Sequence, residues 1–541
     1  NSTLTLSNKQ VELTIDGMTL TNGSFVVADS EDPLTILIND LRKDANSSVN
    51  YGNAIVQIQD DTYVVSGTEN FGDLIIGTET HSVDFSTNEG ATANVQNYFH
   101  LVNGSYSNDI NAALNVQGNA EVAEGTVLNN NHSDAVVSVQ GTISVDGTLN
   151  NEGHVWTGEG MIVGTGTFNN RGAAQIDSDL TLGDSGVVEN YGDLTLAGNL
   201  IKQNETGIFN NRGTLKLTGE SAEIGADVTN LSEVVVNSSN VTISSTFQNE
   251  GWVTAGDSTV TVTNKTTNSN GFIAGTLVVD EGGVFTNLKG SNGATSQAVI
   301  GNTLAIWNGT VVNQDYMTTG VLTGTGRMEN QASFYATDIV ANNGFAFVNG
   351  SDAATEVSGS AAFYDLTNNG SITVAGAMSV FGENAVNNGT LTVGSLSTEG
   401  TSTLVNFGSV TVNSALDGVN YTQSGANAEI SFANDEVTNS TITIADGAAW
   451  AHQLGTGNTY IVESNQKLNV ENGGHLDPDW ASEFSQIVAD AVTSENTFVI
   501  NEGGVLKFNT LGMGGREGEY ITVDGGALQT SLDQIFDGVA Y

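Results

Sequence analysis

The sequence predicts an all-β fold, a right-handed, three-sided parallel β-helix with about 19–21 residues in each coil. The first observation behind this prediction is a motif that recurs at nearly constant spacing. The second is a composition of 65 Gly and only 2 Pro among 541 residues. Because Gly and Asn tolerate tight turns and Val and Thr favour strands, this composition indicates short strands joined by turns. A repeat array also allows a chain of this length to form one continuous structural unit.

The motif reads apolar, any, Asn, any, Gly, small, apolar, Thr, apolar, and Val386–Val393 shows it from the second position onward. Related stretches lie 19 residues before it, at Thr367–Val374, and 19 residues after it, at Val405–Val412. Nineteen residues hold three short strands and three turns, which stack coil upon coil at about 4.8 Å. The central Asn falls at positions 130, 151, 170, 190, 211, 230, 249, 268, 287, 313, 330, 349, 368, 387 and 406.

Each residue of the motif has an expected place in the coil. Apolar residues such as Phe168, Leu194 and Leu196 alternate with Thr, which places the apolar side chains inside and Thr outside. The Gly that follows the Asn is expected to supply a positive φ in the turn. An inward Asn can hydrogen-bond the coils above and below it, so we expect a structural ladder rather than a ligand site. Its predicted members are Asn151, Asn170, Asn190, Asn211, Asn230, Asn249, Asn268, Asn287, Asn330, Asn349, Asn368, Asn387 and Asn406.

The pattern divides the chain into three regions. Residues 1–100 are expected to form an N-terminal cap and decorated first coils, with an exposed loop at Leu41–Ser47. Residues 101–412 carry the regular repeats, and 413–541 form C-terminal coils and a capping region, because a bare last coil invites aggregation. One short helix is predicted in this last region. It has Asp477 as N-cap, Pro478 at its first position, and an apolar face of Trp480, Phe484, Ile487, Val488 and Ala491.

One interval of the repeat is longer than the others. Asn287 and Asn313 are separated by 26 residues, and Lys289–Thr295 is the expected position of the extra residues. Insertions in solenoids become loops on one face, often a binding face. This loop is therefore either part of a binding surface or a tolerated surface insertion.

Charge and cysteine content exclude several classes of function. The formal net charge is −48, from 61 acidic and 13 basic residues, so nucleic acid and anionic membranes would be repelled. The absence of Cys excludes disulfides, thiolate catalysis and Cys-based zinc sites. The six His residues lack metal-ligand spacing, and we expect neither a metal nor a cofactor.

Catalytic motifs are weak. The string Gly183–Gly186 reads Gly-Asp-Ser-Gly, as in chymotrypsin-like proteases, but it lies within the repeat and is expected to be a turn. A polysaccharide hydrolase would need paired carboxylates, whereas the acidic residues are scattered over predicted turns. We therefore expect no enzymatic activity.

A small group of basic residues stands out from the acidic background. It comprises Arg171, Lys202, Arg212 and Lys216, which fall within about three coils. They either pair with Glu152 and Glu205 or form an anion-binding patch for a sulfated or carboxylated glycan. Further candidates for ligand contact lie in the predicted loops, at Arg42, Lys43 and Lys289. Trp156, Trp252, Trp307 and Trp450 are expected to be sugar-stacking platforms where exposed and core or cap residues where buried.

Coils such as Thr167–Gly172, Ile208–Gly213 and Val386–Leu391 resemble those of passenger domains of bacterial autotransporter adhesins, the AIDA-like, type V secreted group. The resemblance covers most of residues 101–412. It implies display on the bacterial cell surface or release from it, with a C-terminal translocator β-barrel downstream that this chain does not include. It also implies that residues 413–541 resemble the segment that assists passenger folding.

The resemblance leaves several functions open. The first is self-association of cells, biofilm formation or attachment to host surfaces through one face of a long rod. The partner would then be a second copy of the chain or a host surface. The alternative is an adhesin for a host glycan or a matrix protein, which would use a groove and the basic patch. A β-helix polysaccharide lyase or hydrolase and a phage tail spike share the architecture.

Overall fold

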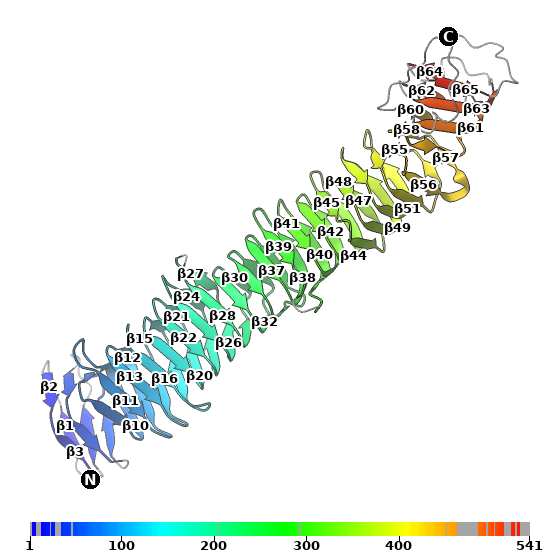
Figure 1. Ribbon diagram of the computed structural model, residues 1–541. Coiled ribbons are helices and arrows are strands. Elements are labelled where there is room, and N and C mark those ends of the chain that lie inside the picture. Colours follow the sequence, from blue (N-terminus) through cyan, green and yellow to red (C-terminus); the bar gives the residue numbers. More distant parts are fainter. Residues whose placement is uncertain are drawn as a thin grey trace. The chain divides into compact units, whose positions relative to one another are not determined.

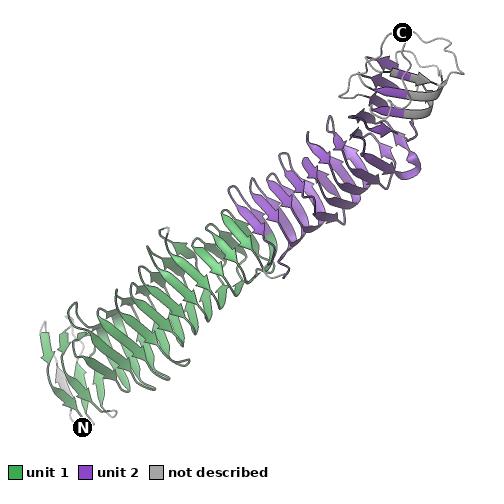
Figure 2. Cartoon of the chain, viewed as in Figure 1, with its two compact units in different colours: residues 1–276 green, residues 277–541 purple. Residues whose placement is uncertain are grey.

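The computed structural model is a parallel β-solenoid of about 24 turns. It forms two compact units, Asn1–Thr276 and Leu277–Tyr541, which are coloured separately in Figure 2. The structure describes residues 3–6, 12–21, 23–27, 34–44, 47–204, 206–290, 294–450, 452–462, 485–493, 496–501, 504–512, 521–524 and 527–530.

Each regular coil contributes three strands, and each strand pairs in parallel with the strand three places later. In the first unit, for example, β17 (Val136–Val139) pairs with β20 (His154–Thr157), β18 (Thr142–Val145) with β21 (Gly160–Val163), and β19 (Thr148–Asn151) with β22 (Thr167–Asn170). Figure 1 shows the strands of successive coils of this unit side by side. The coils therefore have three faces, which we call the first, second and third in chain order.

The first face of unit 1 contains β1 (Thr3–Leu6), β4 (Ser24–Val27), β7 (Ser48–Asn50), the first halves of β10 (Thr68–Ile76) and β12 (Thr92–Leu101), β14 (Ala113–Val116), β17 (Val136–Val139), β20 (His154–Thr157), β23 (Ala173–Ile176), β26 (Asp193–Leu196), β29 (Thr214–Leu217), β32 (Glu233–Val236), β35 (Trp252–Thr254) and the start of β38 (Gly271–Val279). The second face contains β2 (Glu12–Ile15), β5 (Thr35–Ile38), β8 (Ile55–Ile58), the second halves of β10 and β12, β15 (Asn119–Val122), β18 (Thr142–Val145), β21 (Gly160–Val163), β24 (Asp179–Leu182), β27 (Leu200–Lys202), β30 (Ser221–Ile224), β33 (Asn240–Ile243) and β36 (Thr259–Val262). The third face contains β9 (Thr62–Val65), β11 (Val83–Thr87), β13 (Gly104–Asn108), β16 (Val127–Asn130), β19 (Thr148–Asn151), β22 (Thr167–Asn170), β25 (Val187–Asn190), β28 (Ile208–Asn211), β31 (Asp227–Asn230), β34 (Phe247–Asn249) and β37 (Lys265–Asn268), while β3 (Met18–Leu20) and β6 (Leu41–Lys43) form a separate sheet.

Unit 2 repeats this plan. Its first and second faces contain β40 (Gln297–Ile306), β42 (Tyr316–Gly324), β44 (Ser333–Ala341), β46 (Ala354–Val357), β47 (Ala361–Phe363), β49 (Ser371–Val380), β51 (Thr390–Thr398), β53 (Ser409–Val412) and β56 (Glu429–Phe432). Its third face contains β39 (Val284–Asn287), β41 (Thr310–Asn313), β43 (Arg327–Asn330), β45 (Ala346–Asn349), β48 (Asp365–Asn368), β50 (Ala385–Asn387), β52 (Leu404–Asn406), β55 (Asn420–Ser424), β58 (Thr441–Ala445), β60 (Thr459–Val462), β62 (Thr497–Ile500) and β64 (Ile521–Val523). Separate sheets are formed by β54 (Leu416–Asp417) with β57 (Val437–Thr438), and by β59 (Ala449–Trp450), β61 (Gln486–Thr493), β63 (Val505–Gly512) and β65 (Ala527–Thr530).

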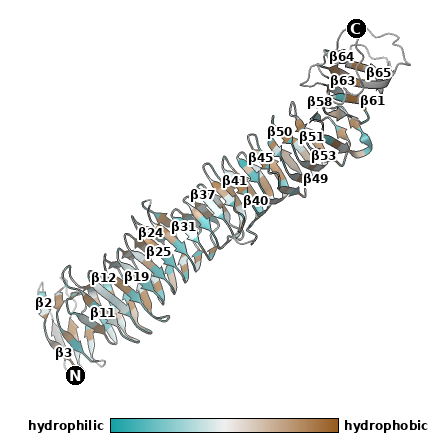
Figure 3. Cartoon of the chain, in the orientation of Figure 1, coloured by the Kyte–Doolittle hydropathy of each residue, from teal (hydrophilic) through white to brown (hydrophobic). Residues whose placement is uncertain are grey.

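Alternating burial along the strands builds the core inside the coils. Phe168 of β22 lies in register between Leu149 and Val188 of the adjacent coils, and all three are fully buried. Complete burial of one such side chain stabilises the fold by about 1.5–3 kcal/mol. The polar and apolar residues alternate visibly along the arrows in Figure 3. The predicted fold class, an all-β parallel solenoid, is confirmed.

The repeat glycine has a role that differs from the predicted one. Gly389 does not adopt a positive φ. A Cβ atom at this position would instead lie 2.0 Å from the backbone oxygen of Gly370 in the preceding coil. The same close approach occurs at Gly192, where a Cβ would lie 2.0 Å from the oxygen of Gly172. Glycine is required here because the turns of successive coils stack backbone on backbone.

The predicted C-terminal helix is wrong. Residues Gln486–Thr493 form β61, whose Ile487 lies in register with Trp450 of β59 and Leu506 of β63. Asp477, Pro478, Trp480 and Phe484 lie outside the described residues. The apolar periodicity of a helix was outweighed by stacking, because parallel pairing on both sides satisfies the strand backbone and buries Ile487. Among the described residues the only helical segment is the 3₁₀ turn η2 (Ala433–Asp435).

Leu41–Lys43 was predicted to lie in an exposed loop and is instead strand β6, paired with β3. Leu41 is buried, with 6% of its surface exposed. The described part of the chain contains no helix long and apolar enough to cross a membrane.

Candidate functional site

The asparagines at the centre of the repeat form a continuous ladder inside each unit. Asn151 Nδ2 donates to Asn170 Oδ1 at 2.7 Å and to the backbone oxygen of Ala173 at 3.1 Å. In unit 1 the ladder runs from Asn108 to Asn268, and in unit 2 it runs from Asn287 to Asn406, which donates to the Tyr421 hydroxyl at 2.9 Å. The predicted members are all at most 1% exposed, at Asn151, Asn170, Asn190, Asn211, Asn230, Asn249, Asn268, Asn287, Asn330, Asn349, Asn368, Asn387 and Asn406. These amides face the interior and cannot contact a ligand.

A second set of amides lies on the outside of the third face of unit 1. Asn150 Nδ2 donates to Asn129 Oδ1 at 2.8 Å, and Asn169 Nδ2 donates to Asn150 Oδ1 at 2.9 Å. Two coils further along, Asn210 Nδ2 donates to Glu189 Oε1 at 2.6 Å. Each ladder amide has two N–H groups and two carbonyl lone pairs, so one of each is left for a partner outside the coil.

The same face is nearly free of charge. Over the five strands β16, β19, β22, β25 and β28, Glu189 is the only charged residue. The other outward positions are Val, Thr, Ile and Asn, and Ile208 is 47% exposed. In a chain of net charge −48, these five consecutive strands with one charged residue form a distinct surface, which we call the neutral face.

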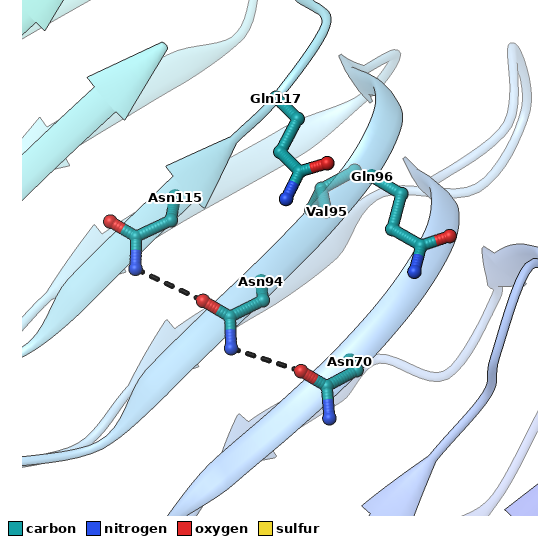
Figure 4. Close-up of a pocket in the computed structure, with 6 residues that line it drawn as sticks. All are labelled: Asn70, Asn94, Val95, Gln96, Asn115 and Gln117. Atoms are coloured by element: carbon teal, nitrogen blue, oxygen red, sulfur yellow. Dashed lines mark hydrogen bonds between the residues drawn. The ribbon is translucent and has the colours of Figure 1, made fainter. Parts of the chain in front are cut away.

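A third amide ladder borders a shallow hollow near the N-terminal end of unit 1 (Figure 4). Asn115 Nδ2 donates to Asn94 Oδ1, and Asn94 Nδ2 donates to Asn70 Oδ1, both at 3.0 Å. The hollow has a volume of about 330 Å³, and its remaining lining residues are Val95, Gln96 and Gln117. Its polar groups are all amides, which match sugar hydroxyls as both donors and acceptors. A hollow of similar volume in unit 2 is lined by Gly400, Thr401, Thr403, Asn420, Tyr421, Thr441 and Thr443.

The structure divides the predicted basic patch. Arg171 and Arg212 lie at the corner between the third and first faces, on either side of the Tyr191 ring. Lys216 lies on β29 of the first face. Lys202 lies on β27 of the second face, where its Nζ donates to Asp227 Oδ2 at 2.8 Å and only 13% of its side chain is exposed. Hence only the two arginines come together.

Tyr191 was not selected as a site residue from the sequence. It follows the ladder residue Asn190, just as Arg171 follows Asn170 and Arg212 follows Asn211. Residues at this position in successive repeats form one column along the corner. The repeat register was therefore the signal that could have identified it.

The residues predicted in loops differ in accessibility. Arg42 is exposed and its Nε lies 3.2 Å from Asp40 Oδ1. Lys289 is exposed at the start of the long insertion, where Asp315 accepts hydrogen bonds from the backbone amides of Gly290 and Ser296.

Lys43 was predicted to lie in an exposed loop and to be a candidate for ligand contact, and the exposed position is wrong. Its side chain is 4% exposed and contacts the Glu69 carboxylate, which is 1% exposed. Burial lowers the pKa of Lys43 to about 7. Tyr63 is hydrogen-bonded to both groups, at 3.2 Å from Lys43 Nζ and 2.8 Å from Glu69 Oε2. The sequence could not reveal this network because its members come from different coils.

The tryptophans also differ in accessibility. Trp252 is 44% exposed, Trp307 is 38% exposed and Trp450 is fully buried. The Nε1 of Trp156 donates to Asp177 Oδ2 at 2.9 Å. Of the four tryptophans that the structure describes, only Trp252 and Trp307 therefore present much ring surface to solvent.

Titratable groups gather at one place on the second face of unit 1. The Tyr98 hydroxyl donates to Glu121, and His100 Nε2 lies 3.5 Å from Glu121 Oε1. Burial, followed by the hydrogen bond and charge of Glu121, raises the pKa of Tyr98 well above its usual range. This phenol stays protonated at neutral pH and acts as a donor.

The Gly-Asp-Ser string forms a turn between β24 and β25, in which Asp184 and Ser185 are exposed. The described residues contain no group of three potential metal ligands.

No family model, curated protein or solved structure matches the chain. Its function must therefore be argued from the neutral face, the amide hollow and the corner arginines.

Proposed function

We propose that the chain is the passenger part of a surface-displayed bacterial adhesin of the autotransporter type, and that it mediates association between cells through the neutral face. The observation that carries this proposal is that Glu189 is the only charged residue on five consecutive strands of the third face. Two chains of charge −48 repel each other, so close contact is least unfavourable where charge is sparse.

The neutral face also offers regular bonding groups. The outer amides Asn129, Asn150 and Asn169 recur at one coil spacing, which is about 4.8 Å. Their unused N–H and C=O groups match a second copy of the same ladder. Individual contacts of this kind are weak, but many of them acting together between two cell surfaces give strong avidity. The proposed partner is thus a second copy of the chain on a neighbouring cell, and the proposed activity is binding rather than catalysis.

Acidic substitutions on the neutral face test this proposal. We expect the pair Asn150→Asp and Asn169→Asp to abolish sedimentation of cells that display the chain, because facing carboxylates repel. The matched control is the pair Thr181→Asp and Asn240→Asp on the second face, which adds the same charge elsewhere. Equal sedimentation by the two variants would overturn the proposal.

Attachment to a glycan is the second candidate function, favoured by the amide hollow of Figure 4. Asn70, Asn94 and Asn115 present aligned amides that suit the hydroxyls of a neutral sugar chain. A glycan array probed with the native chain and with the Asn94→Leu variant tests it. Binding to neutral glycans that is lost in this variant supports the second candidate, and an array without signal removes it.

A further inference from the structure

Three consecutive coils of unit 1 place Arg171, Tyr191 and Arg212 at the same corner. Their backbone positions are fixed by the ladder turns, since the amide of each donates to the carbonyl of the ladder asparagine in the preceding coil, at 2.6–2.7 Å. The Arg171 Cζ atom lies 5.7 Å from the centre of the Tyr191 ring, and the Arg212 Cζ atom lies 5.9 Å from it. All three residues are exposed, Tyr191 by 48%. One ring therefore holds two cations at defined positions.

The two guanidinium groups are available to a ligand. The Arg212 Nε lies 3.6 Å from Glu189 Oε2, which leaves its two terminal nitrogens free for bidentate binding. Among the ion pairs within the described part of the chain, none includes Arg171. Cation–π contact with Tyr191 restricts both side chains and so lowers the entropy lost when they bind an anion.

The spacing of the pair restricts the ligand. Arg171 and Arg212 are two coils apart, or about 10 Å along the stack. A ligand with two anionic groups at about this spacing can pair each of them with one guanidinium group. An extended acidic polysaccharide with a carboxylate on every second sugar repeats its charge over a comparable length.

Neighbouring carboxylates restrict the ligand further. Glu152 occupies the same corner one coil before Arg171, Glu189 pairs with Arg212, and Asp193 follows Tyr191 by two residues. A densely sulfated chain would bring anionic groups against these carboxylates, which disfavours it. A sparsely charged chain can place its carboxylates at the arginines alone and its hydroxyls beside the acidic side chains.

We propose that the corner formed by Arg171, Tyr191 and Arg212 binds an acidic polysaccharide that carries one carboxylate on every second sugar. The arginines bind successive carboxylates, and Tyr191 is a positioning residue that holds both of them. This site borders the neutral face at its corner but uses other side chains and another ligand, so it goes beyond the proposed function.

Hyaluronan oligosaccharides are the direct probe, because their carboxylates fall on alternate sugars. We expect a hyaluronan decasaccharide to bind the native chain in isothermal titration calorimetry, heparin of equal length to bind more weakly and dextran not to bind. Arg171→Ala and Arg212→Ala should each lower the affinity about tenfold, and the double variant should lose binding. Arg327→Ala is the matched control, because Arg327 is exposed in unit 2 and its Nε donates to Glu329 Oε1 at 2.6 Å.

Two further variants separate positioning from folding. Tyr191→Leu should lower the affinity several-fold and Tyr191→Phe should retain it, while both keep the thermal midpoint of the native chain. Three results would overturn the proposal: no binding of hyaluronan to the native chain, equal binding by the double variant, or heparin binding more tightly than hyaluronan. None of these depends on cell sedimentation, so this proposal and the proposed function fail independently.

Discussion

The ammonium group of Lys43 and the carboxylate of Glu69 form an ion pair inside the first coils, with 4% and 1% of their side chains exposed. We expect Glu69→Leu alone to destabilise these coils by about 3–5 kcal/mol, because the buried Lys43, whose pKa is already lowered to about 7, must then either lose its proton or stay charged without a partner. The double variant Lys43→Met, Glu69→Leu should be neutral or stabilising, since it removes both charges. Hydrogen exchange over residues 35–76 measures the local free energy of opening. A double variant as unstable as the single one would contradict the prediction.

The interior and exterior amides are expected to differ in their contribution to stability. Asn190→Ala removes the donor to Asn211 Oδ1 at 2.7 Å and to the backbone oxygen of Thr214 at 3.1 Å. It also leaves the buried Nδ2 of Asn170 without its ladder acceptor, and we expect a cost of about 3 kcal/mol. Asn150→Ala on the exterior should cost no more than about 0.5 kcal/mol. Urea unfolding followed by hydrogen exchange measures the stability of the two variants. Equal losses of stability would show that the interior ladder is not structural.

Close stacking of the turns predicts a strong effect at the repeat glycine. In Gly389→Ala the new Cβ would lie 2.0 Å from the Gly370 oxygen, and this backbone atom cannot move without shifting the coil. We expect the free energy of unfolding to fall by more than about 3 kcal/mol, which is beyond the usual range for one substitution. Gly400→Ala is the control, because Gly400 has a φ of +61° but open space around it, and its cost should be about 1–2 kcal/mol. The thermal midpoint of Gly389→Ala should therefore be lower than that of Gly400→Ala. A lower midpoint for Gly400→Ala would contradict the close stacking of the turns.

Acid should weaken the contact between Lys202 and Asp227. Partial burial raises the pKa of Asp227, but the hydrogen bonds from Lys202, Ser245 and the Thr246 amide outweigh it and hold the pKa below its ordinary value of 3.8. A carboxylate with a lowered pKa adds stability above its unfolded pKa, and this stability is lost as the pH falls through its folded pKa. We therefore expect exchange in the coils around residues 200–246 to accelerate below pH 3.8. The Asp227→Asn variant should not show this acceleration of exchange. If its exchange still accelerates in acid, the cause lies in other carboxylates.

The periodic part of this molecule could be predicted because equivalent residues of successive repeats stack directly on one another. Once Asn387 aligns with Asn368 and Asn406, the inward positions of the whole coil follow. Contacts between coils could not be predicted in the same way. The ion pair of Lys43 with Glu69 joins residues 26 positions apart in the irregular first coils, where no register is visible in the sequence. The four predicted basic residues were close in sequence, but 19–21 residues per coil distribute them over two faces and a corner. Only Arg171 and Arg212 share a register position.

Salt should promote association through the neutral face. At low ionic strength the charge of −48 keeps two chains apart, because its field extends over about 30 Å at 10 mM. At 150 mM the screening length falls to about 8 Å, which weakens this repulsion but leaves hydrogen bonds between amide ladders intact. We expect the weight-average mass in analytical ultracentrifugation to rise between 10 and 150 mM NaCl, and the pair Asn150→Asp, Asn169→Asp to suppress the rise. Association that falls with added salt would instead indicate attraction between opposite charges, such as the corner arginines of one chain and the acidic turns of another.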